Sequence, residues 1–314
     1  EDKLISQIRE IIQRSKVIHV YTHAYPDADP ISSLSAIEKI LSSLDKQVTL
    51  RCDTPINPMY KWFNLKITNK RGLEKPDAII VVDVGETRQL GDIYYDVKDE
   101  FLNLPVINID HHFLTNERFG TINIVYDAIS TTHIIYELAQ KWPINITERL
   151  ATSLFYGLVS DTYFFQRPNT TPVAFNLAAE FSRLGAEPSK VAQLLHKSKS
   201  LEALKFWGKI LLNIKLYNNG EIAMASICKR DFEDNKIKEH DLNLDSFVNF
   251  MTSIESSKIT ILMKEREDNE IRISLRSDYF LDKNSAWDVI NVSEIAKTFG
   301  GGGHRSASGC SIHR

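Results

Sequence analysis

Aspartate and histidine recur at four separate places in the chain, each time directly after a stretch that predicts a strand or a helix. The four segments read His23-Ala24-Tyr25-Pro26-Asp27-Ala28-Asp29, Asp83-Val84-Gly85, Asp110-His111-His112 and Ser160-Asp161-Thr162. Carboxylates gathered together without cations would repel one another and take up protons. A bound cation is therefore the simplest explanation, and mixed imidazole and carboxylate ligands suit Mn²⁺, Zn²⁺ or Fe²⁺ better than Ca²⁺ or Mg²⁺.

The elements that must position these side chains alternate between strands and helices. Apolar runs at residues 17–21, 78–82 and 105–109 predict parallel strands that are covered on both faces. Helical spacing of apolar residues follows at 31–44, and again at 131–141 and 147–160. This succession predicts a doubly wound α/β domain with a mainly parallel sheet, in which ligands bind beyond the carboxyl ends of the strands. A single aspartate at a strand end is more often a turn former or a helix cap, so the joint pattern carries the prediction.

The second half of the chain predicts a helical connector and a smaller domain. The pattern becomes helical from about residue 171, and a turn signal follows at residues 218–220. Strand-like segments at 221–227, 258–264 and 270–275 then surround a helix near 246–255. We expect a doubly wound domain at 1–185, a helical connector at 186–215 and a smaller mixed α/β domain at 216–314.

Four consecutive glycines, Gly300–Gly303, stand out in a chain that has only 13 glycines. A glycine-rich stretch is usually a flexible loop, but here His304 and Arg305 follow it directly. Without Cβ atoms, backbone amides can approach an anion closely, and arginine is a natural bidentate partner of phosphate. Together with Arg276, this segment predicts a site for a phosphate or a terminal nucleotide.

Composition limits the kinds of partner. The 38 basic and 41 acidic residues give a formal net charge of −3, which argues against a protein that coats long nucleic acids but leaves room for a small anionic substrate. No run approaches the roughly 18 apolar residues of a membrane helix, and the N-terminal segment is amphipathic, unlike a signal peptide. Three widely spaced cysteines suggest neither a disulfide framework nor a thiolate zinc site. We expect a cytoplasmic protein.

Six motifs, in order, resemble those of the DHH phosphoesterases, the superfamily of RecJ nucleases, family II pyrophosphatases and nanoRNases. The four segments named first match the motifs of its catalytic domain. Residues 274–277 and 300–309 match the DHH-associated domain of the nanoRNase/pAp-phosphatase branch. The resemblance covers essentially the whole chain. It implies a DHH catalytic domain at 1–185 and a DHH-associated, substrate-binding domain at 216–314.

The resemblance also implies a role for each matched residue. One metal ion, typically Mn²⁺, would be bound by His23, Asp27 and Asp83, and a second by Asp29, Asp83, His111 and Asp161. Two such ions at roughly 3.5–4 Å lower the pKa of a shared water molecule. Asp110 and His112 are the predicted catalytic residues, with Asp110 orienting a histidine and His112 facing the substrate phosphate. The implied substrate-binding residues are Arg276, Gly301, Gly302, Gly303, His304 and Arg305.

The activity that the resemblance implies is hydrolysis of very short RNA to mononucleotides, together with removal of the 3′-phosphate of 3′-phosphoadenosine 5′-phosphate. The same ligand set suits a cyclic dinucleotide or its linear product pApA. It also suits inorganic pyrophosphate or polyphosphate, although these should not need the glycine-histidine-arginine segment. We expect neither a membrane nor long duplex nucleic acid as a partner. A homodimer is one assembly that the chain could form.

Two further alternatives come from other classes of protein. One is a nucleotide sensor that has lost catalysis, which would bind without turnover. The other is a Rossmann-type dinucleotide binder, which predicts the motif G-x-G-x-x-G after the first strand. The sequence has His23-Ala24-Tyr25-Pro26-Asp27 at that place instead.

Three residues depart from the family pattern. Pro30 and Ser32 stand where members usually have alanine and glycine, and Tyr163 stands where glycine is common. Proline is tolerated in the first helical turn because its missing N–H has no partner there. We therefore expect a reshaped loop with every metal ligand retained, and a pocket narrowed by Tyr163.

Overall fold

The computed structural model describes residues 2–70, 72–113, 116–167, 169–196, 199–239, 242, 244–266, 269–278, 280–281 and 287–313. The chain divides into two compact units, Glu1–Lys197 and Ser198–Arg314, which are described separately. Their boundary falls inside the segment 186–215, for which the sequence predicts a connector. Within the described ranges, none of the helices has both the length and the apolar character needed to cross a membrane.

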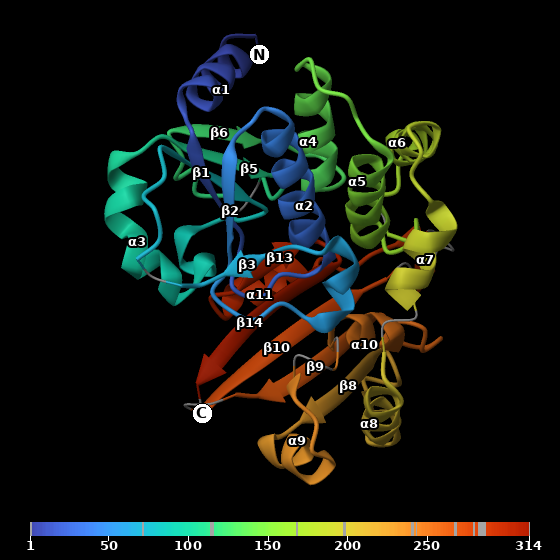
Figure 1. The fold of residues 1–314 in the computed structure, drawn as a ribbon. Helices are drawn as coiled ribbons and strands as arrows, with labels where there is room; N and C mark the ends of the chain where they lie inside the picture. The colour runs from blue at the N-terminus through green and yellow to red at the C-terminus, as the bar shows by residue number, and fades with distance from the viewer. Residues whose placement is uncertain are drawn as a thin grey trace. The chain divides into compact units, whose positions relative to one another are not determined.

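The first unit is built on a six-stranded sheet in which every strand pair is parallel. The strand order is β3-β2-β1-β4-β5-β6 (Figure 1). The first three strands are therefore added from β1 toward one edge of the sheet, and the last three from β4 toward the other edge. The central strands β1, β4 and β5 are buried along their whole length, as their continuous apolar runs predict. The strand bounds are β1 Val17–Tyr21, β2 Gln47–Arg51, β3 Ile67–Thr68, β4 Ala78–Val82, β5 Val106–Asp110 and β6 Ile122–Val125.

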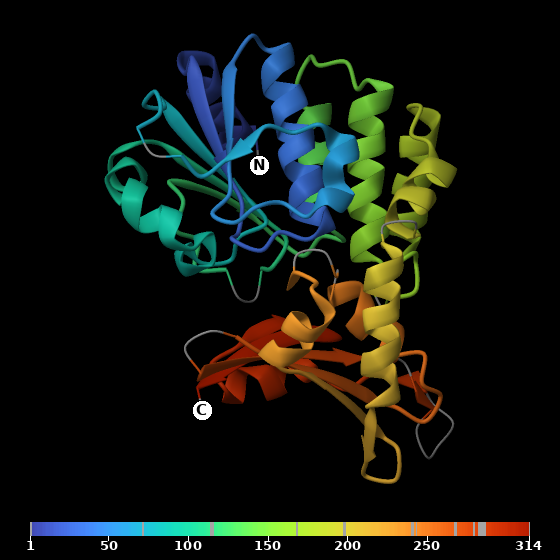
Figure 2. The same ribbon diagram turned by 60° about the horizontal axis from the view of Figure 1, so that its bottom comes forward.

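Helices cover both faces of this sheet, and alternate residues of each strand pack against different helices. Val20 and Ile80 belong to a large core with α1, α2, α4 and α5, whereas Ile79 and Val81 belong to a smaller core with α3. Figure 2 shows α3 on one side of the strands and α2, α4 and α5 on the other. The helix bounds are α1 Asp2–Arg14, α2 Ala28–Ser43, η1 Pro58–Phe63, η2 Thr87–Leu90, α3 Asp92–Asn103, α4 Thr131–Gln140, α5 Glu148–Asp161, α6 Pro172–Arg183 and α7 Pro188–His196.

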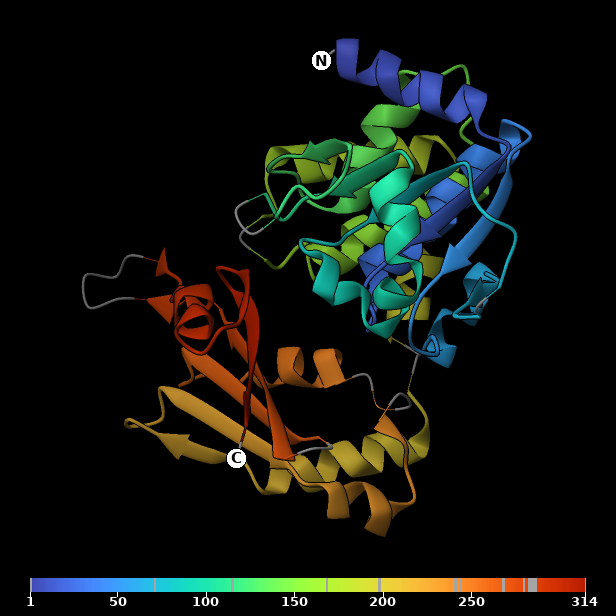
Figure 3. The same cartoon turned by 90° about the vertical axis from the view of Figure 1, so that its left-hand side faces the viewer.

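The second unit has a mixed sheet with the order β13-β14-β10-β9-β8-β7, drawn in yellow to red in Figure 3. Only the β8–β9 pair is parallel among the described pairs of this sheet. Helices α8 and α10 share a core with one face, and α11 packs on the other. The bounds are α8 Leu201–Leu212, β7 Lys215–Tyr217, β8 Ile222–Ile227, α9 Lys229–Asn235, α10 Leu244–Met251, β9 Ile259–Glu265, β10 Glu270–Ser277, β11 Phe280–Leu281, β12 Trp287–Asp288, α11 Val292–Thr298, β13 Gly302–His304 and β14 Ala307–His313.

The predicted fold class is confirmed: a doubly wound parallel sheet is followed by helices and a smaller mixed α/β unit. The prediction omitted several elements, among them α3, β6 and the final pair β13–β14. The last omission has a clear cause, because glycine-rich sequence predicts a loop. Here the last two glycines of the run are in a strand, and Gly302, Gly303 and His304 pair with Gly309, Ser308 and Ala307.

Candidate metal centre

The predicted metal ligands lie at the ends of secondary-structure elements, which hold them on one edge of the first unit's sheet. His23 follows β1, Asp83 follows β4, and His111 follows β5. Asp27 is the N-cap of α2 and accepts a hydrogen bond from the Asp29 N–H at 3.3 Å. Asp161 is the last residue of α5 and completes the predicted set.

The side chains form two overlapping groups with Asp83 in common. One group is His23, Asp27 and Asp83, and the other is Asp29, Asp83 and His111; within each, one nitrogen or oxygen of every residue lies within 4.8 Å of the others. Asp161 joins the second group, because its Oδ2 lies 3.3 Å from His111 Nε2. The structure thus brings together the two ligand sets that the sequence predicts, here called the Asp83 cluster.

Asp83 has an unusual backbone conformation, with φ of 58°. The left-handed region costs a residue with a Cβ atom roughly 1–2 kcal/mol, and such strain gathers at functional sites. The N–H of Asp83 donates to Ile109 O on the neighbouring strand at 2.9 Å, which anchors the residue. Its side chain is only 6% exposed and accepts a hydrogen bond from Thr131 Oγ1 at 2.8 Å.

The start of α4 supports two of these carboxylates, a feature that sequence reasoning missed. Thr131 N–H donates to Asp29 Oδ2 at 2.7 Å, and Thr131 Oγ1 donates to Asp83. A helix N-terminus carries unpaired N–H groups and a partial positive charge, so it stabilises a buried carboxylate. The signal in the sequence is the Ser130-Thr131-Thr132 run at the beginning of a predicted helix, with Ser130 as N-cap.

Burial and mutual repulsion raise the pKa of the clustered carboxyl groups. Burial is the larger cause for Asp29 and Asp83, whose pKa values rise to about 7; the negative charge of Asp83 adds to it for Asp29. The pKa of Asp161 is raised well above its usual range for the same two reasons. Buried carboxylates that lie this close need a compensating positive charge. The donor set therefore fits divalent cations.

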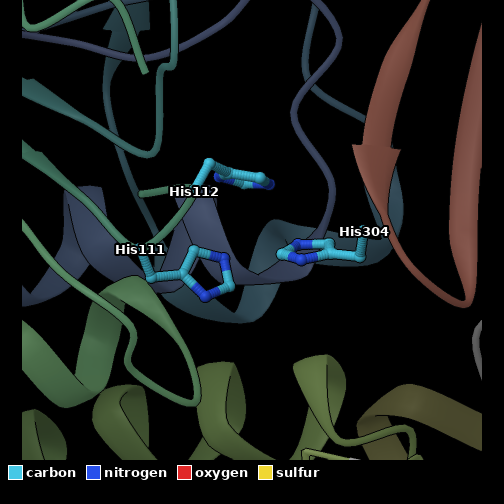
Figure 4. A group of neighbouring side chains, drawn as sticks. All are labelled: His111, His112 and His304. Carbon is cyan, nitrogen blue, oxygen red and sulfur yellow. The ribbon is translucent and has the colours of Figure 1, made fainter. Parts of the chain in front are cut away.

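The adjacent histidines differ in protonation because their surroundings differ. The ring centroids of His111 and His112 are 4.5 Å apart (Figure 4). Burial, followed by the charge of His112, lowers the pKa of His111, so its ring is neutral. Its Nδ1 lies 3.3 Å from Ala128 O. A donor Nδ1–H leaves the Nε2 lone pair facing Asp83 and Asp161, which is the form that binds a metal.

His112 is instead held as an imidazolium by Asp110. Burial opposes this charge, yet the carboxylate of Asp110, together with those of Asp83 and Asp161, outweighs burial and raises the pKa of His112 to about 10. His112 Nδ1 and Asp110 Oδ1 are 2.7 Å apart, and Asp110 is completely buried. Asn116, which sequence reasoning also missed, donates from Nδ2 to Asp110 Oδ2 at 2.7 Å. A cationic ring suits a phosphate oxygen and not a metal ion.

The predicted substrate-binding arginines belong to the second unit and already have protein partners. Arg276 donates from Nε to Asn249 Oδ1 at 2.8 Å and from Nη2 to Asp245 Oδ1 at 2.9 Å. Arg305 donates from Nη2 to Val289 O at 3.0 Å. These contacts fix the direction of both side chains within the second unit.

The glycine run has a packing role besides the one predicted from its composition. A Cβ on Gly301 would lie 2.2 Å from Gly309 O, and one on Gly303 would lie 2.6 Å from Ala307 O. A Cβ on Gly302 would meet nothing within 4 Å. Two of the glycines are therefore required by the close approach of β13 to β14, whereas Gly302 has no such requirement. His304 is the last residue of β13.

The three departures from the family pattern have separate consequences. Pro30 lies in the first turn of α2, and Ser32 donates from Oγ to Ala28 O at 2.6 Å, so both are accommodated by the helix. Tyr163 lies two residues after Asp161 and has φ of 46°, a conformation that glycine adopts without strain. The expected narrowing of a pocket by Tyr163 stays a prediction.

The raised carboxyl pKa values predict how cation binding depends on pH. Asp29 and Asp83 have folded-state pKa values of about 7 against 3.8 for the free group, so the free energy of unfolding without cations falls as pH rises between these values. Cations bind the ionised carboxylates and reverse this loss. We expect Mn²⁺ to raise Tm more at about pH 8 than at about pH 5, by calorimetry against a chelated reference. Equal shifts at the two pH values would contradict the assignment.

Two family models match the chain. The DHH family N-terminal domain matches residues 17–158, and the DHHA1 domain matches residues 221–314. The chain contains a DHH family N-terminal domain followed by a DHHA1 domain. The first match includes every residue of the Asp83 cluster except Asp161, and the second includes Arg276 and the glycine run. The family resemblance that the motifs predict is confirmed.

Named relatives and a solved structure agree with this assignment. The bifunctional oligoribonuclease and PAP phosphatase NrnA of Thermus thermophilus is 25% identical over 99% of this chain and 88% of its own length. The cyclic-di-AMP phosphodiesterase PdeA of Listeria monocytogenes is 26% identical over 97% of this chain but 46% of its own length. An exopolyphosphatase-related protein from Bacteroides fragilis shares the fold, with a TM-score of 0.84 at 23% identity, over 100% of this chain and 92% of that chain. The predicted hydrolase class of this chain is confirmed.

Proposed function

We propose that this chain is a phosphoesterase that hydrolyses very short RNA oligonucleotides to mononucleotides and removes the 3′-phosphate of 3′-phosphoadenosine 5′-phosphate. The observation that carries the proposal is the Asp83 cluster, in which two ligand groups share one carboxylate beside a cationic histidine. The oligoribonuclease and PAP phosphatase named above supports the choice of substrates, because its similarity extends over nearly the whole chain.

Two divalent cations, for which we propose Mn²⁺, would be held by this chain's own carboxylates and imidazoles. His23, Asp27 and Asp83 would hold one, and Asp29, Asp83, His111 and Asp161 the other. When bound, such a pair makes water acidic enough to supply a nucleophile near neutral pH and offsets charge on phosphoryl oxygens. Thr131 keeps Asp29 and Asp83 oriented through two hydrogen bonds.

The remaining predicted residues would bind and orient the substrate. His112 carries a positive charge that Asp110 sustains, so it would donate a charge-assisted hydrogen bond to a phosphate oxygen. A fixed cationic donor of this kind would stabilise the charge that develops on a phosphoryl oxygen. In the DHHA1 domain we assign substrate binding to Arg276, Gly301, Gly302, Gly303, His304 and Arg305.

The glycine run offers a prediction that separates packing from substrate binding. A Gly301→Ala change should destabilise the protein by about 1–3 kcal/mol, since its Cβ would overlap Gly309 O. A Gly302→Ala change should leave Tm unchanged because its Cβ meets nothing, yet raise KM for a dinucleotide by blocking the approach of an anion to the backbone. Thermal unfolding and steady-state kinetics on both variants measure the two effects. An unchanged KM in Gly302→Ala would remove Gly302 from the proposed site.

The proposed function is tested by a substrate panel with products identified by mass spectrometry. The panel holds an RNA dinucleotide, 3′-phosphoadenosine 5′-phosphate, pApA, cyclic di-AMP and pyrophosphate, each with Mn²⁺ and with a chelator. We expect mononucleotide from the RNA dinucleotide and AMP from 3′-phosphoadenosine 5′-phosphate, and no product after chelation. The fastest turnover on pyrophosphate would overturn the proposal.

A second candidate is turnover of cyclic di-AMP or of its linear product pApA. The observation that favours it is the similarity to PdeA, which extends over 97% of this chain. Cleavage of cyclic di-AMP at a higher kcat/KM than the RNA dinucleotide would replace the first candidate with this one. Binding of nucleotides without turnover would instead identify a sensor.

A further inference from the structure

The segment that follows Asp161 holds three successive residues in the left-handed region. The φ angles are 46° for Tyr163, 58° for Phe164 and 61° for Phe165. Each such residue with a Cβ atom costs roughly 1–2 kcal/mol, so three in a row need a compensating reason. The backbone strain most needs a reason at Tyr163, where a glycine would remove it.

Packing explains Phe164 and Phe165. The Phe164 ring stacks on His196, with centroids 4.3 Å apart, and the Phe165 ring stacks on Phe175, with centroids 5.3 Å apart. Both phenylalanines also pack against the main hydrophobic core of the first unit. Their burial therefore offsets their backbone strain.

Tyr163 is placed differently. Its ring is partly exposed, and the guanidinium carbon of Arg167 lies over it, 5.9 Å from the centroid. The segment is tied to the end of α5, because the N–H groups of Gln166 and Arg167 donate to Thr162 O at 2.9 and 3.0 Å. Asn169 donates from Nδ2 to Asp161 O at 3.4 Å. The ring is thus held on a fixed segment that begins at a residue of the Asp83 cluster.

Tyr163 and Arg167 belong to the segment that directly follows Asp161. The Arg167 N–H donates at 3.0 Å to the carbonyl of Thr162, the residue next to Asp161. A partly exposed aromatic ring and a guanidinium therefore lie together beside the place where a phosphate would be held. An aromatic ring backed by a cation is a surface on which a nucleobase stacks, with little preference among bases.

We propose that Tyr163, backed by Arg167, is a stacking surface for the nucleobase of a nucleotide whose phosphate lies at the Asp83 cluster. The proposal rests on the phosphoesterase function proposed above and adds the specificity of the same site. Tyr163 makes the chain prefer nucleotides over phosphates that lack a base. It acts by binding, and it has no part in the bond-breaking step.

The test uses three variants. Tyr163→Gly removes the ring together with the left-handed strain, and Tyr163→Phe keeps the ring without the hydroxyl. Lys236→Gly is the matched control, because Lys236 has φ of 51° in the second unit, at the end of α9. Tm of each variant is measured first, and we expect neither glycine variant to lose stability, since glycine fits the left-handed region.

The two ligands are AMP and ribose 5-phosphate, which differ in the presence of the base. Each is titrated calorimetrically into each protein in the presence of Mn²⁺. The unaltered protein and Tyr163→Phe should bind AMP about tenfold more tightly than ribose 5-phosphate. Tyr163→Gly should lose that preference by weaker AMP binding alone, and Lys236→Gly should keep it. KM for pApA or an RNA dinucleotide should rise about tenfold in Tyr163→Gly with kcat little changed.

The outcomes separate this inference from the function on which it rests. If the unaltered protein does not prefer AMP, or if Tyr163→Gly keeps the preference, the stacking surface is refuted. If the preference is lost in Tyr163→Gly but the unaltered protein hydrolyses no dinucleotide, the stacking surface stands and the proposed function fails. If Tyr163→Gly has a lower Tm and loses affinity for AMP and ribose 5-phosphate equally, Tyr163 has a structural role and the inference is overturned.

Discussion

An Asp83→Asn variant is expected to lose at least about 10³-fold in kcat/KM for an RNA dinucleotide. Asp83 is the one residue shared by the two ligand groups, and an amide offers one neutral oxygen where the carboxylate offers two charged ones. With a chelator at about pH 8, the same variant should unfold at the same temperature as the unaltered protein or higher. The reason is that it lacks a buried carboxyl whose pKa is raised to about 7.

The matched control for this variant is Asp45→Asn. Asp45 also has a left-handed backbone, with φ of 57°, but it lies in the turn after α2. Its replacement should leave kcat/KM unchanged within about twofold. If Asp83→Asn retained activity within about tenfold of the unaltered protein, the Asp83 cluster would not be the site of hydrolysis.

An Asp110→Asn variant is expected to lose about 10²–10³-fold in kcat while keeping its affinity for Mn²⁺. Burial lowers the pKa of His112, but Asp110, with Asp83 and Asp161, raises it to about 10, and an amide at position 110 would no longer supply its share of that rise. The pKa of His112 then falls, so activity should decline as pH rises through the new, lower value. The unaltered protein should keep the contribution of His112 to a higher pH than the variant.

The pH profile of kcat distinguishes this role from a structural one. An Asp99→Asn change on the exposed side of α3 serves as the control and should reproduce the profile of the unaltered protein. A lower kcat in Asp110→Asn with an unshifted profile would mean that Asp110 only maintains the fold near His112. Mn²⁺ affinity reduced in parallel with kcat would place Asp110 among the metal ligands instead.

The sequence predicted the placement of the Asp83 cluster because topology alone brings its residues together. His23, Asp83 and His111 follow strands that are neighbours in a parallel sheet, and such strands end on the same edge. The supports of the cluster could not be predicted in the same way. Thr131 reaches Asp29 and Asp83 across 102 and 48 positions of sequence, and only the packing of α4 beside α2 and β5 shows it.

The opposite states of His111 and His112 were also beyond the sequence. The family resemblance gave the two residues different roles, but they are identical and adjacent, so the residue types alone did not predict their different protonation. The difference arises from Asp110 Oδ1, which lies 2.7 Å from His112 Nδ1, and from the carbonyl of Ala128, which faces His111. The strand β13 escaped prediction for a related reason, since Gly301 and Gly303 serve a close approach that only the folded sheet reveals.

Counting the Mn²⁺ ions that the chain binds is the most direct test of the Asp83 cluster. Calorimetric titration of the chelator-treated protein near neutral pH gives the stoichiometry, and the Asp83→Asn variant is titrated beside it. Two ions per chain are expected for the unaltered protein and fewer than two for the variant, with hydrolysis of the RNA dinucleotide lost in parallel. No bound ion, or a stoichiometry that does not change when Asp83 is replaced, would contradict a metal centre built on this residue.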